Sequence, residues 1–262
     1  MKFFLSMILA QMVMKISHRG YIDSKFTMEN SHRSITNAIN NDFDVIELDV
    51  QLTKDNIIIL HHDLYINSLK SDNLKKSDNL KKSDDLKFDD LKSEDFNYKL
   101  ISETNYSDLK KIKKEILKIN ELFKIDNLDK KSLYLDLKGS DELSKELINF
   151  FDNNFVFNND IYLGSFNKNH LTDLSIYNKI NNLNFKLGYI TDNRLLKNDL
   201  DNWKKDYDID FLSLSWEMLR NDTLEYLNNN DIKCFTFTCK NKLILDYIKR
   251  FNIDGIVSDL II

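Results

Sequence analysis

The stretch Val45-Ile-Glu-Leu-Asp-Val-Gln-Leu-Thr-Lys-Asp-Asn-Ile-Ile-Ile-Leu-His-His-Asp63 contains two strand-like runs with very little between them. Residues 46–53 and 57–62 are rich in Val, Ile and Leu, as strands are. Only the polar tripeptide 54–56 separates them, whereas parallel neighbours need a crossover of about a dozen residues or more. The stretch therefore predicts an antiparallel hairpin.

The register of this hairpin determines which side chains share a face. If residues 55–56 form a two-residue turn, Asp49 lies opposite His62 and on the same face as Glu47. A slip of one residue would place His61 there instead. The opposite face is apolar and is predicted to pack beneath helices, which turns both acids toward the interior; its residues are Ile46, Leu48 and Val50.

Similar apolar runs recur along the chain, and polar segments of helical length lie between most of them. Strands are expected at 13–17, 45–50, 133–137, 161–165, 186–190, 211–216, 233–238 and 255–259, and helices at segments such as 31–41, 142–151 and 242–251. This alternation predicts an α/β fold, a closed (β/α)8 TIM barrel in which the hairpin extends the second strand. A doubly wound sheet is the alternative. It is disfavoured because no glycine-rich phosphate loop follows the first strand.

The connection between the second and third barrel strands is unusually long. Residues 64–131 exceed any ordinary barrel loop and are predicted to form an insertion. Within it, the hexapeptide Ser-Asp-Asn-Leu-Lys-Lys repeats from Ser71 onward. One leucine per six residues gives no helical stripe, so 68–98 is interpreted as a low-complexity tract. Residues 107–124 have amphipathic periodicity and are predicted to form one helix.

The N-terminal segment and the cysteines indicate the cellular compartment of the protein. Residues 1–12 precede the barrel domain expected at 13–262, and the apolar run 3–14 has the length of a signal-peptide core. A terminal cap or a misassigned start are the alternatives. Cys234 and Cys239 are expected on opposite faces of a strand, so no disulfide is predicted and a reducing, cytoplasmic location is favoured. Secretion or membrane association would follow if the apolar run acts as a signal.

The overall composition narrows the classes of partner. The 262 residues contain 37 Lys+Arg and 42 Asp+Glu, which gives a net charge of −5, and 42% of them are hydrophobic. This balance argues against wholesale disorder and against a multi-pass membrane protein. Because a nucleic-acid-binding protein would carry an excess of basic residues, nucleic acid is not expected as a partner. A small-molecule substrate is expected, and the oligomeric state stays open.

Chemically capable side chains lie at the carboxyl ends of predicted strands, where barrel active sites form. His18 follows the first strand, Glu47 and Asp49 share a face of the second, and Asp136 and Lys138 share a face of the third. Three carboxylates suit Ca²⁺ or Mg²⁺, which keep coordination positions open for substrate oxygens and water. A lysine beside that metal suits an anionic substrate, most obviously a phosphate.

The order of these segments closely resembles that of the glycerophosphodiester phosphodiesterase family. Its hallmark series HRG, EN, ELDV, TKDG and HD has counterparts at 18–20, 29–30, 47–50, 53–56 and 62–63. Weaker family motifs have counterparts at 135–138, 165–166, 237–238 and 254–259. The resemblance covers about 13–262 apart from the insertion.

The resemblance implies a metal-dependent phosphodiesterase that hydrolyses glycerophosphodiesters to glycerol 3-phosphate and an alcohol, by way of a cyclic phosphate. It implies a TIM barrel with an insertion after the HD hairpin. The implied metal ligands, for one Ca²⁺ or Mg²⁺, are Glu47, Asp49 and Asp136. The implied acid–base pair is His18 and His62. The implied phosphate-binding residues are Arg19 and Lys138, with Glu29 orienting Arg19.

Two departures from the family pattern stand out. Asp136 occupies a position where the family usually has Glu, and Asn56 replaces the turn glycine with another residue that tolerates positive φ. Two alternatives remain open. One is a lysophospholipase D or sphingomyelinase-D-like phosphodiesterase acting on lipids, and the other is a catalytically inactive relative that only binds. The presence of every implied ligand and both histidines favours an enzyme.

Overall fold

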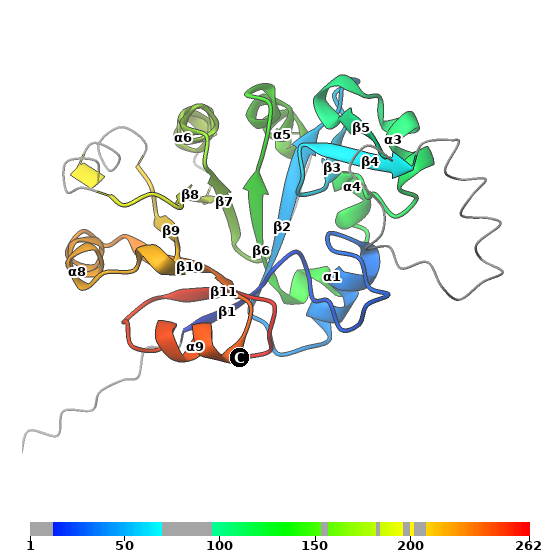
Figure 1. The fold of residues 1–262 in the computed structure, drawn as a ribbon. Coiled ribbons are helices and arrows are strands. Elements are labelled where there is room, and N and C mark those ends of the chain that lie inside the picture. Colours follow the sequence, from blue (N-terminus) through cyan, green and yellow to red (C-terminus); the bar gives the residue numbers. More distant parts are fainter. Residues whose placement is uncertain (1–12, 70–95, 153–156, 182–183, 196–199, 202–207) are drawn as a thin grey trace, which may run out of the picture.

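Eight parallel strands close into a barrel in the computed structural model, which describes residues 13–69, 96–152, 157–181, 184–195, 200–201 and 208–262. The barrel strands are β1 (Met14–Ser17), β2 (Val45–Leu52), β6 (Ser132–Leu137), β7 (Ile161–Ser165), β8 (Lys186–Thr191), β9 (Phe211–Ser215), β10 (Lys233–Cys239) and β11 (Gly255–Ser258). Each pairs with the next, and β1 closes the ring by pairing with both β11 and β2. The predicted TIM barrel is confirmed (Figure 1).

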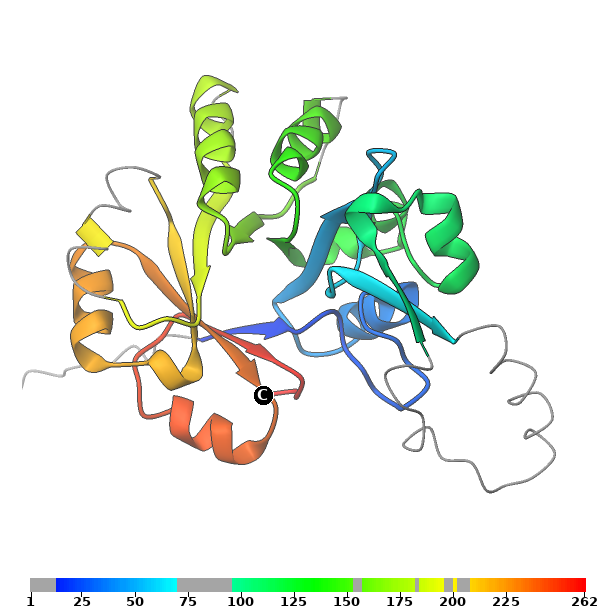
Figure 2. The ribbon, with the colours of Figure 1, turned by 45° about the horizontal axis from the view of Figure 1, so that its top comes forward.

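Helices connect the strands and lie around the outside of the barrel (Figures 1 and 2). They are α1 (His32–Ile39), α5 (Glu142–Asp152), α6 (Lys168–Asn181), α8 (Asn221–Asn229), α9 (Lys242–Ile248) and the 3₁₀ turn η5 (Trp216–Met218). The outward face of β2 packs against this layer as predicted: Ile46, Leu48 and Val50 belong to one buried cluster with Ile35 of α1 and Leu143 of α5.

The inward faces of the strands change character along the barrel axis. Toward the amino-terminal ends of the strands, apolar and aromatic side chains fill the interior as one cluster. Its buried members are Ile16, Val45, Tyr134, Tyr162, Ile190, Phe211, Phe235 and Val257. Two residues further along the same faces come His18, Glu47, Asp136 and Asp259. Because residues two apart on a strand point to the same side, both the apolar cluster and these four polar side chains point into the barrel.

The hairpin between β2 and β3 (Ile58–Leu60) is confirmed, but its predicted register is wrong by one residue. His61 lies opposite Asp49, and its backbone N–H donates to the Asp49 carbonyl at 3.1 Å. The turn holds three residues instead of two, because Asn56 adopts a left-handed conformation with φ 57° and Thr53 pairs with Ile57. An additional turn residue displaces every following pair by one position.

The insertion forms a separate layer beside β2 and β3 (Figures 1 and 2). It contains the antiparallel pair β4 (Tyr65–Leu69) and β5 (Phe96–Leu100), the helices α3 (Tyr106–Ile112) and α4 (Ile119–Leu122), and the 3₁₀ turns η3 (Ile101–Glu103) and η4 (Leu128–Lys130).

The prediction of a single helix over 107–124 is wrong, because a turn at 114–115 and a β-bridge at Lys118 separate α3 from α4. There the Leu60 N–H donates to the Leu117 carbonyl at 2.9 Å, and Ile59 forms a bridge with Lys118. Residues 117–118 thus pair with the outer edge of β3 and do not form helical hydrogen bonds. This pairing satisfies backbone groups of β3 that an edge strand would otherwise leave without a partner.

Some predictions fall partly or wholly outside the described residues. Residues 1–12 and most of the tract 68–98 are among them.

Cys234 and Cys239 are both free and buried. Within the described ranges, none of the helices has the length and apolar character needed to cross a bilayer.

Candidate active site

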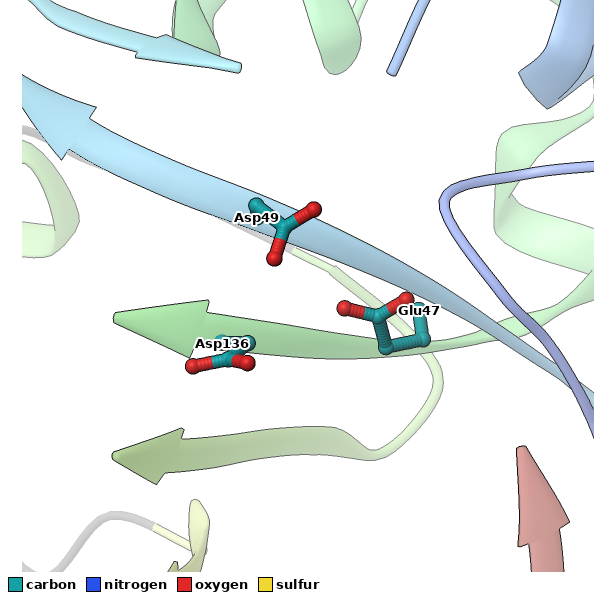
Figure 3. Close-up of side chains that lie close together, drawn as sticks. All are labelled: Glu47, Asp49 and Asp136. Atoms are coloured by element: carbon teal, nitrogen blue, oxygen red, sulfur yellow. The ribbon is translucent and has the colours of Figure 1, made fainter. Parts of the chain in front are cut away.

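Three acidic side chains from two neighbouring strands converge near the carboxyl end of the barrel (Figure 3). Glu47 and Asp49 come from β2, and Asp136 comes from β6, where it is the direct partner of Asp49 across the parallel ladder. All three are buried, and one carboxylate oxygen from each lies within 4.8 Å of the other two. The structure therefore brings together the three predicted metal ligands.

Arg19 reaches this cluster from the end of β1. Its backbone N–H donates to Glu47 Oε2 at 2.8 Å, and its Nε lies 3.3 Å from Asp49 Oδ2. Its Nη1 donates to Glu29 Oε2 at 2.6 Å. The backbone of Arg19 has φ 54°, an uncommon conformation for a residue with a side chain. Backbone and guanidinium are thus both held against acidic groups.

Lys138 approaches the same cluster from the end of β6. Its Nζ donates to Asp136 Oδ2 at 2.7 Å and lies 3.2 Å from Asp49 Oδ1. Its side chain is only 15% exposed. The two predicted phosphate-binding cations therefore lie on two sides of Asp49.

His18 and His62 each contact a carboxylate through Nδ1. His18 Nδ1 lies 2.7 Å from Asp259 Oδ1, and His62 Nδ1 lies 2.8 Å from Asp63 Oδ1. A carboxylate only accepts hydrogen bonds, so each neutral ring carries its hydrogen on Nδ1 and has Nε2 as its basic nitrogen.

A cleft of about 170 Å³ contains both imidazoles and the acidic cluster. Its remaining lining includes the two cations and a set of aromatic and small side chains: Tyr134, Phe166, Ile190, Ser213, Phe237, Thr238 and Val257. His62 reaches this cleft although the hairpin register differs from the predicted one. The reason is that β3 ends at Leu60, so strict alternation no longer governs His61 and His62.

Burial and mutual repulsion act strongly on the three acids. Burial, reinforced by Asp49 and Asp136, raises the pKa of Glu47 well above its usual range. Burial also raises the pKa of Asp136 to about 7, with Asp49 acting in the same direction and Lys138 against it. For Asp49, burial is outweighed by Lys138 and Arg19, which hold its pKa below the usual range.

The acidic cluster is chemically suited to a divalent cation. It offers hard oxygen ligands only, as Ca²⁺ and Mg²⁺ prefer. Asp136 Oδ1 is buried and has no hydrogen-bond partner among the described residues, so one ligand atom is available. Two of the three carboxyls are driven toward the neutral form in the absence of a positive ion. A divalent cation would remove that repulsion.

Several supporting residues were not assigned a role from sequence. Asn30, part of the EN motif, donates from Nδ2 to Asp49 Oδ2 at 2.8 Å and accepts the Asp49 N–H at 3.0 Å. Gln51 lies on the same strand face as Glu47 and Asp49, and its Nε2 is within 3.0 Å of the carbonyls of residues 61–63. It fixes the backbone that carries His62, a role that alternation along β2 could have suggested.

Of the three histidines outside the cleft, two are buried. His61 is buried, with Nδ1 3.3 Å from Lys113 Nζ. His170 is fully buried, and its ring contacts Ser165 Oγ and the Ser140 carbonyl. Both therefore have structural partners.

The fold and the site together define a (β/α)8 barrel with a buried acidic cluster, two imidazoles and two cationic side chains at one cleft. The model of the glycerophosphoryl diester phosphodiesterase family matches residues 18–262, and the chain belongs to this family. Its enzyme class is that of the glycerophosphodiester phosphodiesterases.

Solved structures similar to this one share its fold. A glycerophosphodiester phosphodiesterase from Thermotoga maritima is 21% identical, with 94% of each chain covered and a TM-score of 0.67. A phosphodiesterase from Oleispira antarctica, solved with the product sn-glycerol-3-phosphate, is 19% identical, with 94% of this chain and 92% of that chain covered and a TM-score of 0.69. A glycerophosphodiester phosphodiesterase from Parabacteroides distasonis is 17% identical, with coverage of 95% and 93% and a TM-score of 0.66. Among curated proteins, none matches.

Proposed function

We propose that the chain hydrolyses glycerophosphodiesters to glycerol 3-phosphate and an alcohol, with His18 and His62 as the acid–base pair. The observation that carries this proposal is the convergence on one cleft of two imidazoles, each bound to a carboxylate through Nδ1, with three buried acids. The product bound in the Oleispira antarctica phosphodiesterase supports glycerol 3-phosphate as the product here as well.

The two imidazoles supply proton transfer. In its neutral form, one ring takes the proton of the glycerol 2-hydroxyl on Nε2 as that oxygen attacks phosphorus. The other ring, protonated, gives its Nε2 proton to the departing alkoxide. The attack leaves a cyclic phosphate, and the same two groups, with their roles exchanged, assist water in opening it.

Arg19 and Lys138 bind and orient the phosphate. Burial opposes the charge of Lys138, yet Asp136 and Asp49 raise its pKa, so it stays cationic. Glu29 positions the Arg19 guanidinium by accepting from Nη1. Two fixed cations on two sides of Asp49 hold a phosphodiester in one orientation.

The residues that would hold a divalent cation, Ca²⁺ or Mg²⁺, are Glu47, Asp49 and Asp136. When bound, the ion supplies Lewis-acid chemistry that polarises a phosphoryl oxygen and lowers the pKa of the attacking hydroxyl. Asn30 keeps Asp49 in place through its two hydrogen bonds.

The test is hydrolysis of glycerophosphocholine, with glycerol 3-phosphate and choline both quantified. We expect activity that chelation abolishes and that Ca²⁺ or Mg²⁺ restores. His18→Ala and His62→Ala should each lower kcat by at least ~10²-fold, whereas His32→Gln, at an exposed position on α1, should leave it unchanged. Full activity of either alanine variant, or of the exhaustively chelated protein, would refute the assignment.

A further inference from the structure

A lysine of the insertion reaches the loop that carries His62. Lys113 directly follows α3, and its Nζ lies 3.3 Å from His61 Nδ1. We propose that Lys113 is a positioning residue for His62, because it fixes the ring of the neighbouring His61. The inference rests on the proposed catalytic role of His62, and it assigns a task to the insertion.

The two contacts of the His61 ring determine its tautomer. An ammonium group only donates, so His61 Nδ1 accepts from Lys113. The other ring nitrogen, Nε2, lies 3.4 Å from the Tyr65 carbonyl oxygen, which only accepts. The hydrogen of His61 is therefore on Nε2, whereas the hydrogens of the neutral His18 and His62 rings are on Nδ1.

The His61 ring ties together the two ends of the loop that carries His62. The segment 61–65 leads from the end of β3 into β4, and the ring of its first residue donates to the carbonyl of its last. His62 and Asp63 lie between these ends. Because His61 is buried, little water competes for its hydrogen bonds. A fixed His61 ring therefore restricts the positions that His62 can adopt.

The barrel and the insertion hold different parts of this loop. From β2, the Gln51 amide binds the backbone carbonyls of residues 61–63. From the insertion, Lys113 binds the side chain of His61. The insertion is itself anchored beside the loop, because Ile66 of β4 and Leu109 of α3 share one buried cluster. Gln51 thus fixes the backbone of the loop, and Lys113 fixes the ring that closes it.

Lys113 also interacts with the carboxylates that orient two cleft side chains. Burial lowers the pKa of Lys113, whereas Glu29 and Asp63 act in the opposite direction. Glu29 binds Arg19, and Asp63 binds His62. Charges that are partly removed from water interact more strongly than exposed ones. Loss of Lys113 would therefore disturb the balance of charge around both carboxylates.

The first measurement is steady-state hydrolysis of glycerophosphocholine. Lys113→Met removes the donor and the charge, and it should lower kcat by about tenfold or more. KM should stay unchanged, because Lys113 does not line the cleft. Lys113→Arg, which still donates, should recover part of the loss. The matched control is Lys110→Met: Lys110 Nζ donates within the insertion, to the Ile116 carbonyl at 2.7 Å, and its loss should leave kcat unchanged.

The second measurement determines the tautomer of His61 without any need for activity. Long-range proton–nitrogen NMR correlations of isotope-labelled histidine separate the two neutral tautomers, and the His61 signal is assigned by its loss in His61→Gln. We expect a hydrogen on Nε2 in the natural chain and in Lys110→Met. In Lys113→Met, the signal should shift toward a mixture of tautomers, because Nδ1 has lost its donor.

The outcomes separate this inference from the proposed function. If glycerophosphocholine is hydrolysed and Lys113→Met lowers kcat no more than Lys110→Met does, the positioning role is overturned and the proposed function stands. A hydrogen on Nδ1 of His61 in the natural chain overturns the positioning role as well, whatever the activities are. If the metal-loaded protein hydrolyses no glycerophosphodiester, the proposed function fails and the inference fails with it.

Discussion

At the scale of single residues, the two cleft imidazoles have similar partners in different surroundings. The side chains of His18 and Asp259 are 17% and 38% exposed, whereas those of His62 and Asp63 are 34% and 54% exposed. Charges that are less exposed to water interact more strongly. Asp259 should therefore hold its imidazole more firmly than Asp63 does.

Asp259→Asn is expected to lower kcat for glycerophosphocholine by about 10-fold to 10²-fold, since the amide no longer fixes the ring and its tautomer. KM should stay unchanged because Asp259 acts through His18, and Asp259→Glu should recover part of the loss. Asp63→Asn should have a smaller effect in the same assay. Asp246→Asn, at an exposed position on α9, is the control. A rise in KM at constant kcat would contradict a positioning role.

The raised pKa of Asp136 predicts how stability depends on pH in the metal-free protein. Between its ordinary value of 3.8 and about 7, folded Asp136 keeps a proton that the unfolded chain has released. The free energy of unfolding must therefore fall as pH rises through this window. Asp136→Asn, which imitates the neutral acid, should remove this part of the decline.

Urea denaturation of both proteins at several pH values measures the difference. The variant should gain stability relative to the natural chain as pH rises from about 4 to about 7. At neutral pH, Ca²⁺ or Mg²⁺ should stabilise the natural chain more than the variant. Parallel pH curves for the two proteins would contradict the prediction.

At the scale of elements, Asn56 determines the turn length and the register of the hairpin that leads to His61 and His62. With φ 57° it occupies the left-handed region, which an alanine adopts at a cost of about 1 kcal/mol or more. Asn56→Ala should therefore lower the free energy of unfolding by about that amount. Asn56→Gly, which lacks the steric penalty, should stay within a few tenths of a kcal/mol of the natural chain. Chemical denaturation checks both, and equal stability of the two variants would rule the explanation out.

The elements themselves follow closely from local pattern. The strand expected at 161–165 coincides with β7, because apolar residues flanked by polar ones define both ends. The predictions fail where the structure depends on a single backbone angle or on a hydrogen bond to a residue far away in the sequence. Whether Asn56 adds a third residue to the turn depends on one φ angle, and the break in the helix expected at 107–124 depends on pairing with β3. Neither feature has a periodic signal in the chain.

At the scale of the whole molecule, the packing of the barrel interior depends on Gly188, which leaves room for an aromatic ring. A Cβ on Gly188 would stand 2.2 Å from the Phe211 ring, which cannot withdraw because it is fully buried and stacked on Phe235 at 4.8 Å. Gly188→Ala should therefore lower the free energy of unfolding by about 1–3 kcal/mol.

Adding Phe211→Leu to Gly188→Ala should recover part of this loss, because the smaller side chain makes room. The double-mutant cycle should then show a favourable coupling, measured by urea denaturation of the four proteins. An unchanged midpoint in Gly188→Ala would show that the interior is looser than the contacts imply.

The candidate site was predictable where each residue has its own motif. The alternating faces of β2 and β6 place Glu47, Asp49 and Asp136 together, and the ordered series of motifs identifies the histidines. The pairing of His18 with Asp259 could not be predicted in this way. The two residues are 241 positions apart, and only closure of the barrel brings them together.

That pairing makes the proposed role of His18 depend on closure of the barrel. During translation, His18 is synthesised 241 residues before Asp259, the carboxylate that orients its ring. A translating intermediate already possesses every acidic ligand, yet it lacks the group that aligns His18. Removal of Asp259 by proteolysis should therefore lower kcat as Asp259→Asn does, while Glu47, Asp49 and Asp136 stay in place.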